Sequence, residues 1–299
     1  MGLKKLTLAD RGVFREFLAL RPHELSVYNF ANIYIWRGLF EISWEILDAN
    51  LCVFFEDPIG RFLYLAPLGE KISFKALESS FELMDSRNKN SFVSRVENVE
   101  AADVKVLQKS GYRLRAKPGE YLCSRKSLSE LKGDGYKSKR AVINFFIKHY
   151  SACFREYLPA DSQACLELYR LWSKERSGAS RDPVYRGMLE DNLTCLEKML
   201  ADFRVLDLTA RVVETKEGIK AFTAGFKINP ETFCVLYEFA DLSVKGVSQY
   251  IFRRFCQELD GYKYINIMDD SGLKNLKVVK ESYRPLRLVP ALIADRKNG

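Results

Sequence analysis

The two halves of this 299-residue chain carry the same order of helix-like and strand-like segments. In the second half, the spacing of apolar residues predicts the order β-α-α-β-β-β-α-β-α-β, with antiparallel strands first and a βαβ crossover after them. The first half repeats this order approximately, from its two helices onward. The last helix-to-strand corner also recurs, at residues 110–114 and again at residues 282–286. We therefore expect two similar α+β domains, residues 1–130 and 131–299, joined near residues 125–137.

The positions of these elements follow from local patterns. Ser73 precedes apolar residues spaced three, four and three apart, which is typical of a capped helix. The turn residues at 216–218 and 229–230 predict hairpins in the second half. Strands are expected at 42–47, 51–55, 62–66, 92–96, 112–123, 153–158, 205–213, 219–228, 232–239, 264–268 and 286–294. Helices are expected at 10–20, 30–36, 74–84, 101–110, 161–172, 189–203, 247–255 and 272–282.

Composition excludes several classes of protein. With 47% hydrophobic and 29% charged residues, the chain is neither disordered nor collagen-like, and no uncharged run approaches the ~18 residues of a membrane helix. Its start lacks the apolar stretch of a signal peptide, so we expect a cytoplasmic protein, with peripheral attachment to a membrane left open. Seven scattered cysteines and two histidines form no recognisable ligand set, so no metal site is expected.

The net charge of +8 is concentrated in one segment. Residues 105–150 hold twelve basic and three acidic side chains, a net charge of +9. Such a stripe is typical of a surface that binds a polyanion such as tRNA, and a lysine-rich solvated surface is the competing interpretation. Within it we expect Lys137, Lys139 and Arg140 to contact the polyanion, so that charge reversal there weakens binding more than charge reversal elsewhere.

Four stretches of the sequence resemble the bacterial family DUF2156, which is grouped with the soluble C-terminal domain of phosphatidylglycerol lysyltransferases. They are residues 28–37, 137–140 with 143–145, 237–241 with Gly246, and 266–285. The resemblance covers essentially the whole chain. It implies tandem GNAT-like (acyl-CoA N-acyltransferase) domains, similar to those of Fem-type aminoacyltransferases, each with a mixed, mostly antiparallel sheet flanked by helices.

The chain departs from the family pattern at four positions. Members usually carry an acidic residue at Met268, a Gly at Asn275 and an Arg at Lys277, and often a Lys at Phe239. These departures indicate either an altered substrate or lost catalysis. The lysyltransferases also carry a multi-helix membrane portion that this sequence lacks, so a small-molecule acceptor is expected ahead of a lipid headgroup.

The resemblance implies a donor that is either an aminoacyl-tRNA or a coenzyme A thioester. Acetyltransferases of this fold bind the pyrophosphate of coenzyme A at a Gly-rich turn that opens a helix. The equivalent residues 241–248 contain a single glycine, Gly246, so we expect aminoacyl-tRNA ahead of coenzyme A. Gly246 is equally compatible with an ordinary turn that requires a positive φ.

Transfer of an aminoacyl group builds a tetrahedral oxyanion and removes a proton from the acceptor. Lys280 is our first candidate to stabilise the oxyanion, and a solvated helix face is the alternative for it. Asp269 and Asp270 follow a predicted strand, where one can hold an acceptor amine and the other can cap the next helix. Glu238 ends an apolar strand, where it either orients the acceptor or pairs with a buried cation. The residues expected to bind substrate are Asp241, Gly246, Ser248, Asn266, Ser282, Tyr283 and Arg284.

Three functions therefore remain open after the sequence alone. The preferred one is an aminoacyltransferase that uses tRNA as donor and an amine or hydroxyl as acceptor. The others are an acyl-CoA N-acyltransferase and a non-catalytic module that binds RNA or a ligand. The aromatic and amide-rich segment at residues 28–36 is expected to be core, with base stacking as its alternative.

Overall fold

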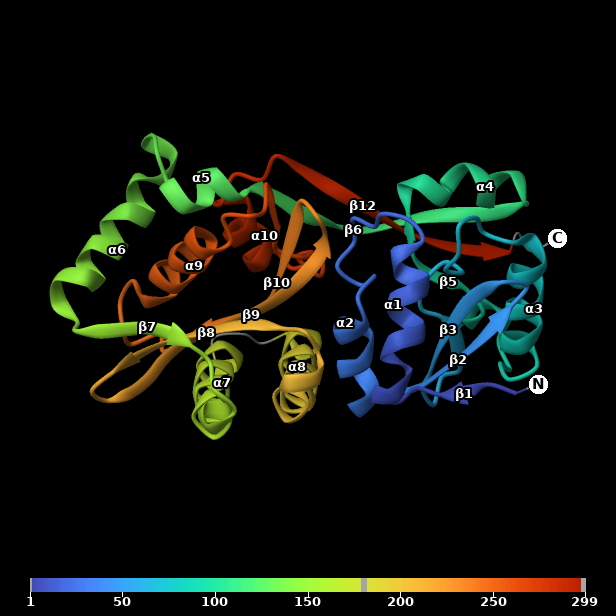
Figure 1. The fold of residues 1–299 in the computed structure, drawn as a ribbon, viewed down its shortest axis with the longest axis horizontal. Coiled ribbons are helices and arrows are strands. Elements are labelled where there is room, and N and C mark those ends of the chain that lie inside the picture. Colours follow the sequence, from blue (N-terminus) through green and yellow to red (C-terminus); the bar gives the residue numbers. More distant parts are fainter. Residues whose placement is uncertain (1, 179–181, 297–299) are drawn as a thin grey trace. The chain divides into compact units, whose positions relative to one another are not determined.

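The computed structural model describes residues 2–178 and 182–296 and divides into two compact units (Figure 1). Unit 1 comprises residues 2–120 and 288–296, and unit 2 comprises residues 121–178 and 182–287. The ranges expected from the sequence, 1–130 and 131–299, differ from these units in two ways: residues 121–130 belong to unit 2, and the last strand lies in unit 1. That strand, β12 (Arg287–Arg296), pairs with a strand of unit 1.

Unit 1 contains a mostly antiparallel sheet in the order β1-β2-β3-β4-β5-β12-β6. Among the described strand pairs with a determined register, β4 is parallel to β5 and the others are antiparallel. The strands are β1 (Lys4–Lys5), β2 (Glu41–Leu47), β3 (Asn50–Glu56), β4 (Arg61–Leu63), β5 (Val96–Glu100) and β6 (Tyr112–Ser124).

The helices of unit 1 are α1 (Arg11–Ala19), α2 (Phe30–Ile35), α3 (Phe74–Asp85) and α4 (Val104–Lys109). Ser73 caps α3 as predicted, because its side chain accepts a hydrogen bond from the backbone N–H of Ala76. All six residues of α2 are buried. The interpretation of the aromatic segment as core is therefore confirmed for this helix.

Unit 2 repeats the same sheet order. The end of β6 pairs with β11 (Tyr264–Asn266), which lies parallel to β10 (Thr232–Ala240). The remaining strands, β9 (Gly218–Asn229), β8 (Thr209–Thr215) and β7 (Ala152–Glu156), continue the sheet with antiparallel pairs. The one parallel pair in each unit follows from the helix that connects its two strands, α3 in unit 1 and α9 (Val247–Glu258) in unit 2.

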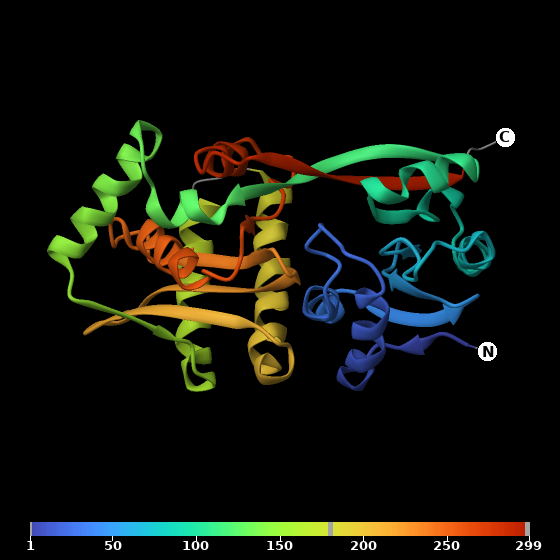
Figure 2. The ribbon, with the colours of Figure 1, turned by 45° about the horizontal axis from the view of Figure 1, so that its top comes forward.

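Helices cover both faces of the unit 2 sheet. The long helices α7 (Ser162–Gly178) and α8 (Pro183–Ala201) lie on one face and α9 on the other, as Figures 1 and 2 show. Two further helices, α5 (Arg125–Glu130) and α6 (Lys137–His149), pack against α9. A third helix, α10 (Lys274–Glu281), follows α9 and β11 in the chain.

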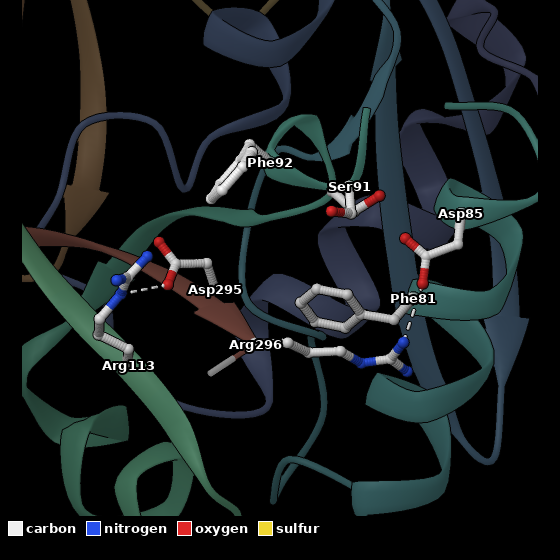
Figure 3. Close-up of a pocket in the computed structure, with 8 residues that line it drawn as sticks. Phe81, Asp85, Ser91, Phe92, Arg113, Asp295 and Arg296 are labelled. Carbon is white, nitrogen blue, oxygen red and sulfur yellow. Dashed lines mark hydrogen bonds and ion pairs between the residues drawn. The ribbon is translucent and has the colours of Figure 1, made fainter. Parts of the chain in front are cut away.

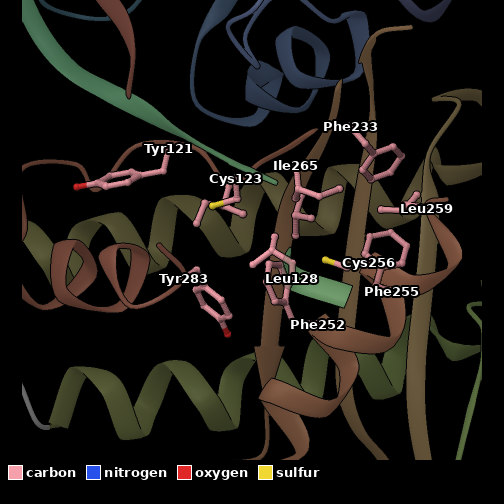
Figure 4. Close-up of a cluster of buried hydrophobic side chains, with 12 residues drawn as sticks. Tyr121, Cys123, Leu128, Phe233, Phe252, Phe255, Cys256, Leu259, Ile265 and Tyr283 are labelled. Atoms are coloured by element: carbon pink, nitrogen blue, oxygen red, sulfur yellow. The ribbon is translucent and has the colours of Figure 1, made fainter. Parts of the chain in front are cut away.

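A cluster of buried side chains from β6, β10, β11, α5 and α9 forms part of the core of unit 2 (Figure 4). Phe233, Phe255 and Ile265 belong to it, and Tyr121 and Tyr283 lie at one end with their hydroxyl groups directed out of the cluster. Burial of this apolar surface stabilises the unit by roughly 25 cal/mol per Å2. The two tyrosines connect this core to the polar residues described below.

The predicted elements occur in the predicted order, with these differences. The structure adds β1 and α6, which were not predicted, and the segment expected to be a join, residues 125–137, contains α5 and a 3-10 turn at Asp134–Tyr136 before α6. The strand expected at 92–96 lies at Val96–Glu100 instead, after a 3-10 turn at Ser91–Val93. The Asn90 side chain caps that turn through the N–H of Phe92, which leaves Phe92 exposed rather than in a strand.

Candidate active site

Glu238 lies near the end of β10 and faces residues from three helical segments of unit 2. Its carboxylate accepts a hydrogen bond of 3.0 Å from the hydroxyl of Ser248 in α9. Burial raises the pKa of Glu238 to about 7, although Ser248 and the positive charges of Lys139 and Lys280 act in the opposite direction. A carboxyl group with this pKa exchanges a proton readily near neutral pH, as a general base must.

Lys139, from α6, contacts the segment that follows α10. Its ammonium group donates a hydrogen bond of 2.8 Å to the Ser282 hydroxyl and lies 3.7 Å from the centre of the Tyr283 ring. Tyr283 is itself fixed by its carbonyl, which accepts a 2.9 Å hydrogen bond from Tyr136, and by its ring, which packs on Phe252. The structure thus brings Glu238, Ser248, Ser282 and Tyr283 together with Lys139, which the sequence assigned to the polyanion surface.

Asp270 follows β11, and Lys280 lies in α10. The Lys280 ammonium donates to the carbonyl of Ile267, and Asp270 accepts hydrogen bonds from the Tyr121 hydroxyl (2.7 Å) and the N–H of Gly272 (2.9 Å). Burial alone would raise the pKa of Asp270, but these two hydrogen bonds and the charges of Lys277 and Lys280 lower it. Asp270 is therefore an ionised group within the electrostatic reach of Lys280.

The turn between β10 and α9 is held by Asp241. This carboxylate accepts hydrogen bonds from the backbone and side chain of Ser243 and forms a 3.0 Å ion pair with Lys220. Those contacts lower the pKa of Asp241 although burial opposes them. In this structure Asp241 stabilises the turn that starts α9.

Gly246 begins α9 with a φ of +89°, so the interpretation as a turn residue with positive φ holds. A Cβ atom on Gly246 would lie 2.1 Å from the carbonyl oxygen of Val142 in α6. That side of the glycine is therefore occupied by the backbone of a neighbouring helix.

The remaining predicted residues have local roles in the structure. Asp269 accepts from the backbone of Ser271, and the Asn266 side chain accepts from the N–H of Met268, which has a positive φ of 61°. The Arg284 side chain packs against Gly135. Arg140 donates to the carbonyls of Leu131 and Gly133, whereas Lys137 is exposed.

The basic segment does not form one uniform patch. Arg113 and Arg115 in unit 1 both pair with Asp295, and Lys117 pairs with Glu97. A pocket of about 200 Å3 next to Arg113 also contains an ion pair between Arg296 and Asp85, beside Phe81 (Figure 3). Arg113 and Arg115 share the single carboxylate of Asp295, so this pairing offsets only one of their two positive charges. None of the predicted site residues lines this pocket.

Two further observations concern the described residues, 2–178 and 182–296. Among them, no helix combines the length and apolar character needed to cross a bilayer. In the same residues, no three His, Cys, Asp or Glu side chains are arranged to hold a metal ion.

The model of one protein family, described as phosphatidylglycerol lysyltransferase, C-terminal, matches residues 18–294. This chain belongs to that family. The match confirms the resemblance found in the sequence and spans both units. A search of curated protein sequences found no match.

Several solved structures share the fold of this family member. A conserved protein of unknown function from Bacteroides thetaiotaomicron VPI-5482 is 27% identical, with a TM-score of 0.87 over 99% of this chain and 100% of that one. L-PGS from Bacillus licheniformis is 15% identical, with a TM-score of 0.68 over 99% and 94%. A tandem GNAT protein from the clavulanic acid biosynthesis pathway is 7% identical, with a TM-score of 0.52 over 100% and 99%. The predicted fold class, tandem GNAT-like α+β domains, is confirmed.

Sequence reasoning about this family member missed the position of Lys139. The signal that could have found it is the spacing of Lys139, Ile143 and Phe146, which places these residues on one side of a helix. Ile143 and Phe146 are buried. A lysine on the same side as two buried residues is directed inward, whereas Lys137 lies elsewhere on the helix and is exposed.

Proposed function

We propose that this family member transfers an aminoacyl group from tRNA to an amine or hydroxyl acceptor, and that the reaction takes place in unit 2 around Glu238. The observation that carries the proposal is the half-buried carboxyl of Glu238, with a pKa of about 7 and two lysines acting on it. Membership of a family described as phosphatidylglycerol lysyltransferase supports the reaction class. It also makes the phosphatidylglycerol headgroup an acceptor to test beside the small-molecule acceptors expected from the sequence.

The proposed reaction is an aminolysis of the ester when the acceptor is an amine, and a transesterification when it is a hydroxyl. Glu238 removes a proton from the acceptor nitrogen or oxygen, which attacks the ester carbonyl of the aminoacyl-tRNA. The tetrahedral oxyanion forms in the positive potential of Lys280, our candidate stabiliser. When the ester bond breaks, the proton held by Glu238 passes to the 3′ oxygen of the tRNA. No redox partner is required.

Coenzyme A as the donor receives less support from the geometry. The pyrophosphate of that cofactor needs close approach to free N–H groups at the start of a helix. At Gly246, where α9 starts, the carbonyl of Val142 occupies the space that a Cβ would fill. An acyl-CoA reaction is retained as an outcome of the test below.

The test is a transfer assay with purified protein, a panel of charged tRNAs and several acceptors. The acceptors are vesicles with and without phosphatidylglycerol, and small amines. Loss of ester-linked amino acid that depends on both the protein and one acceptor supports the proposal. No acceleration with any charged tRNA, together with salt-dependent retention of RNA, would leave an RNA-binding module. Thermal stabilisation by coenzyme A without transfer from tRNA would favour the acyl-CoA alternative.

The polyanion surface is tested at the exposed lysines of α6. We expect Lys137→Glu with Lys148→Glu to weaken tRNA binding and to reduce the slope of log Kd against log salt by about 2, since each lysine that contacts phosphate contributes about one counterion. The matched control is Lys174→Glu with Lys216→Glu, which makes the same charge change at two exposed sites of unit 2. Equal losses in both pairs would mean that only net charge matters.

A further inference from the structure

Lys139 differs from its basic neighbours in α6. Lys137 is exposed, and Arg140 is committed to the carbonyls of Leu131 and Gly133 at the end of α5. Lys139 is half-buried and lies on the same side of the helix as the buried residues Ile143 and Phe146. Its ammonium group therefore lies against unit 2, beside the exposed hydroxyl of Ser282.

Two contacts fix the position of this ammonium group. It lies 2.8 Å from the Ser282 hydroxyl and 3.7 Å from the centre of the Tyr283 ring, a geometry in which the ring face attracts the cation. Burial lowers the pKa of Lys139, and the charge of Glu238 opposes that shift. The lysine is thus fixed on an aromatic ring, at a place where its charge and that of Glu238 influence each other.

The groups that face Glu238 come from every segment packed against it. Ser248 and Cys256 belong to α9, Lys139 to α6, Lys280 to α10, and Tyr283 follows α10. Burial raises the pKa of the Cys256 thiol and of the Tyr283 phenol well above their usual values, so both are neutral around pH 7. The two lysines are therefore the charged members of this group.

We infer that Lys139 is a positioning residue of the proposed active site, fixed there by Ser282 and the Tyr283 ring, that its charge favours the ionised form of Glu238, and that it is not part of the polyanion-binding surface. The catalytic role that this inference gives to Lys139 rests on the proposed function. The electrostatic coupling between Lys139 and Glu238 does not depend on that function and is measured separately.

The first experiment measures the coupling without any substrate. The free energy of unfolding is measured from pH 4 to pH 9 for four proteins: the natural chain, Lys139→Met, Glu238→Gln and the double variant. Comparing each protein that keeps Glu238 with its Glu238→Gln counterpart isolates the titration of this carboxyl. We expect the pH at which Glu238 ionises to rise by about one unit in the Lys139→Met background, because a nearby cation is lost. Lys137→Met, two residues away and exposed, should leave it unchanged.

The second experiment is the pH profile of transfer. If Glu238 acts in its ionised form, the acidic limb of kcat/KM should move up by about one pH unit in Lys139→Met, with roughly tenfold slower transfer at pH 6.5 and nearly full recovery at pH 9. Lys139→Arg keeps the charge and should restore the limb. Binding of tRNA at a fixed salt concentration should be nearly unchanged in Lys139→Met.

The outcomes separate the inference from the proposed function. An unchanged ionisation of Glu238 in the stability measurements overturns the inference, whatever the transfer assay shows. A shifted ionisation without any transfer supports the coupling and contradicts the proposed function. A loss of tRNA affinity in Lys139→Met as large as in Lys137→Met, with an unchanged pH profile, returns Lys139 to the polyanion-binding surface and overturns the inference.

Discussion

Glu238→Gln is expected to lower transfer by about 100- to 10,000-fold, because the amide cannot accept the proton of the acceptor. The same substitution should stabilise the protein at neutral pH. Burial raises the pKa of this carboxyl from 4.5 to about 7, so the folded state binds its proton more tightly than the unfolded state does. Ionisation of Glu238 therefore costs stability, and the glutamine removes that cost.

The pH window follows from these two values. Below pH 4.5 the carboxyl is protonated in both states, and the two proteins should differ little in stability. Between pH 4.5 and 7 the natural protein loses stability relative to the variant, and above pH 7 the difference is constant. We expect a plateau of about 1–3 kcal/mol in favour of the variant.

Urea unfolding at pH 4, 6 and 8, with the transfer assay on the same samples, checks both parts of this prediction. Glu175→Gln in α7 is the matched control, because that glutamate is exposed in the same unit. It should change neither transfer nor the pH dependence of stability. Full activity in Glu238→Gln would remove Glu238 from the mechanism, and a lower stability of this variant at pH 8 would contradict the unfavourable burial of the charge.

Gly246→Ala is expected to destabilise the protein by about 3 kcal/mol or more. The backbone at Gly246 has a φ of +89°, which costs an alanine roughly 1–2 kcal/mol. The new methyl group would also lie 2.1 Å from the carbonyl oxygen of Val142, which is backbone and cannot rotate away as a side chain can. Helix α6 must therefore move, and Lys139 lies on that helix, one turn before Val142.

Substitutions at two other glycines distinguish the cost of the positive φ from the cost of the contact with Val142. Gly218→Ala has the same kind of backbone, with a φ of +103°, but open space around it, so it should show the cost of positive φ alone. Gly187→Ala lies within α8 with no neighbour near its Cβ and should stabilise the protein by about 0.5–1 kcal/mol. Urea midpoints of the three variants give the comparison. If Gly246→Ala costs no more than Gly218→Ala, the packing of α6 against Gly246 contributes nothing.

Most of the fold could be predicted from the sequence because helix and strand periodicity are local properties. The exception in unit 1 shows where this fails. The strand Val96–Glu100 contains three polar residues, Glu97, Asn98 and Glu100, all buried. They are tolerated because Lys117 pairs with Glu97 and Asn98, and His23 pairs with Glu100. These partners are distant in sequence, so no local pattern shows that the segment is a buried strand.

The sequence by itself determined the order of elements, the family and the candidate carboxylate Glu238, since each depends on residue type and spacing. Only the tertiary structure decided what each charged residue does. It placed Lys139 on Ser282 and the Tyr283 ring, committed Arg140 to the end of α5, and paired Arg113 with Asp295. The physical reason is that the charge state and direction of a side chain depend on burial and on partners far away in the chain, 182 residues away in the case of Arg113.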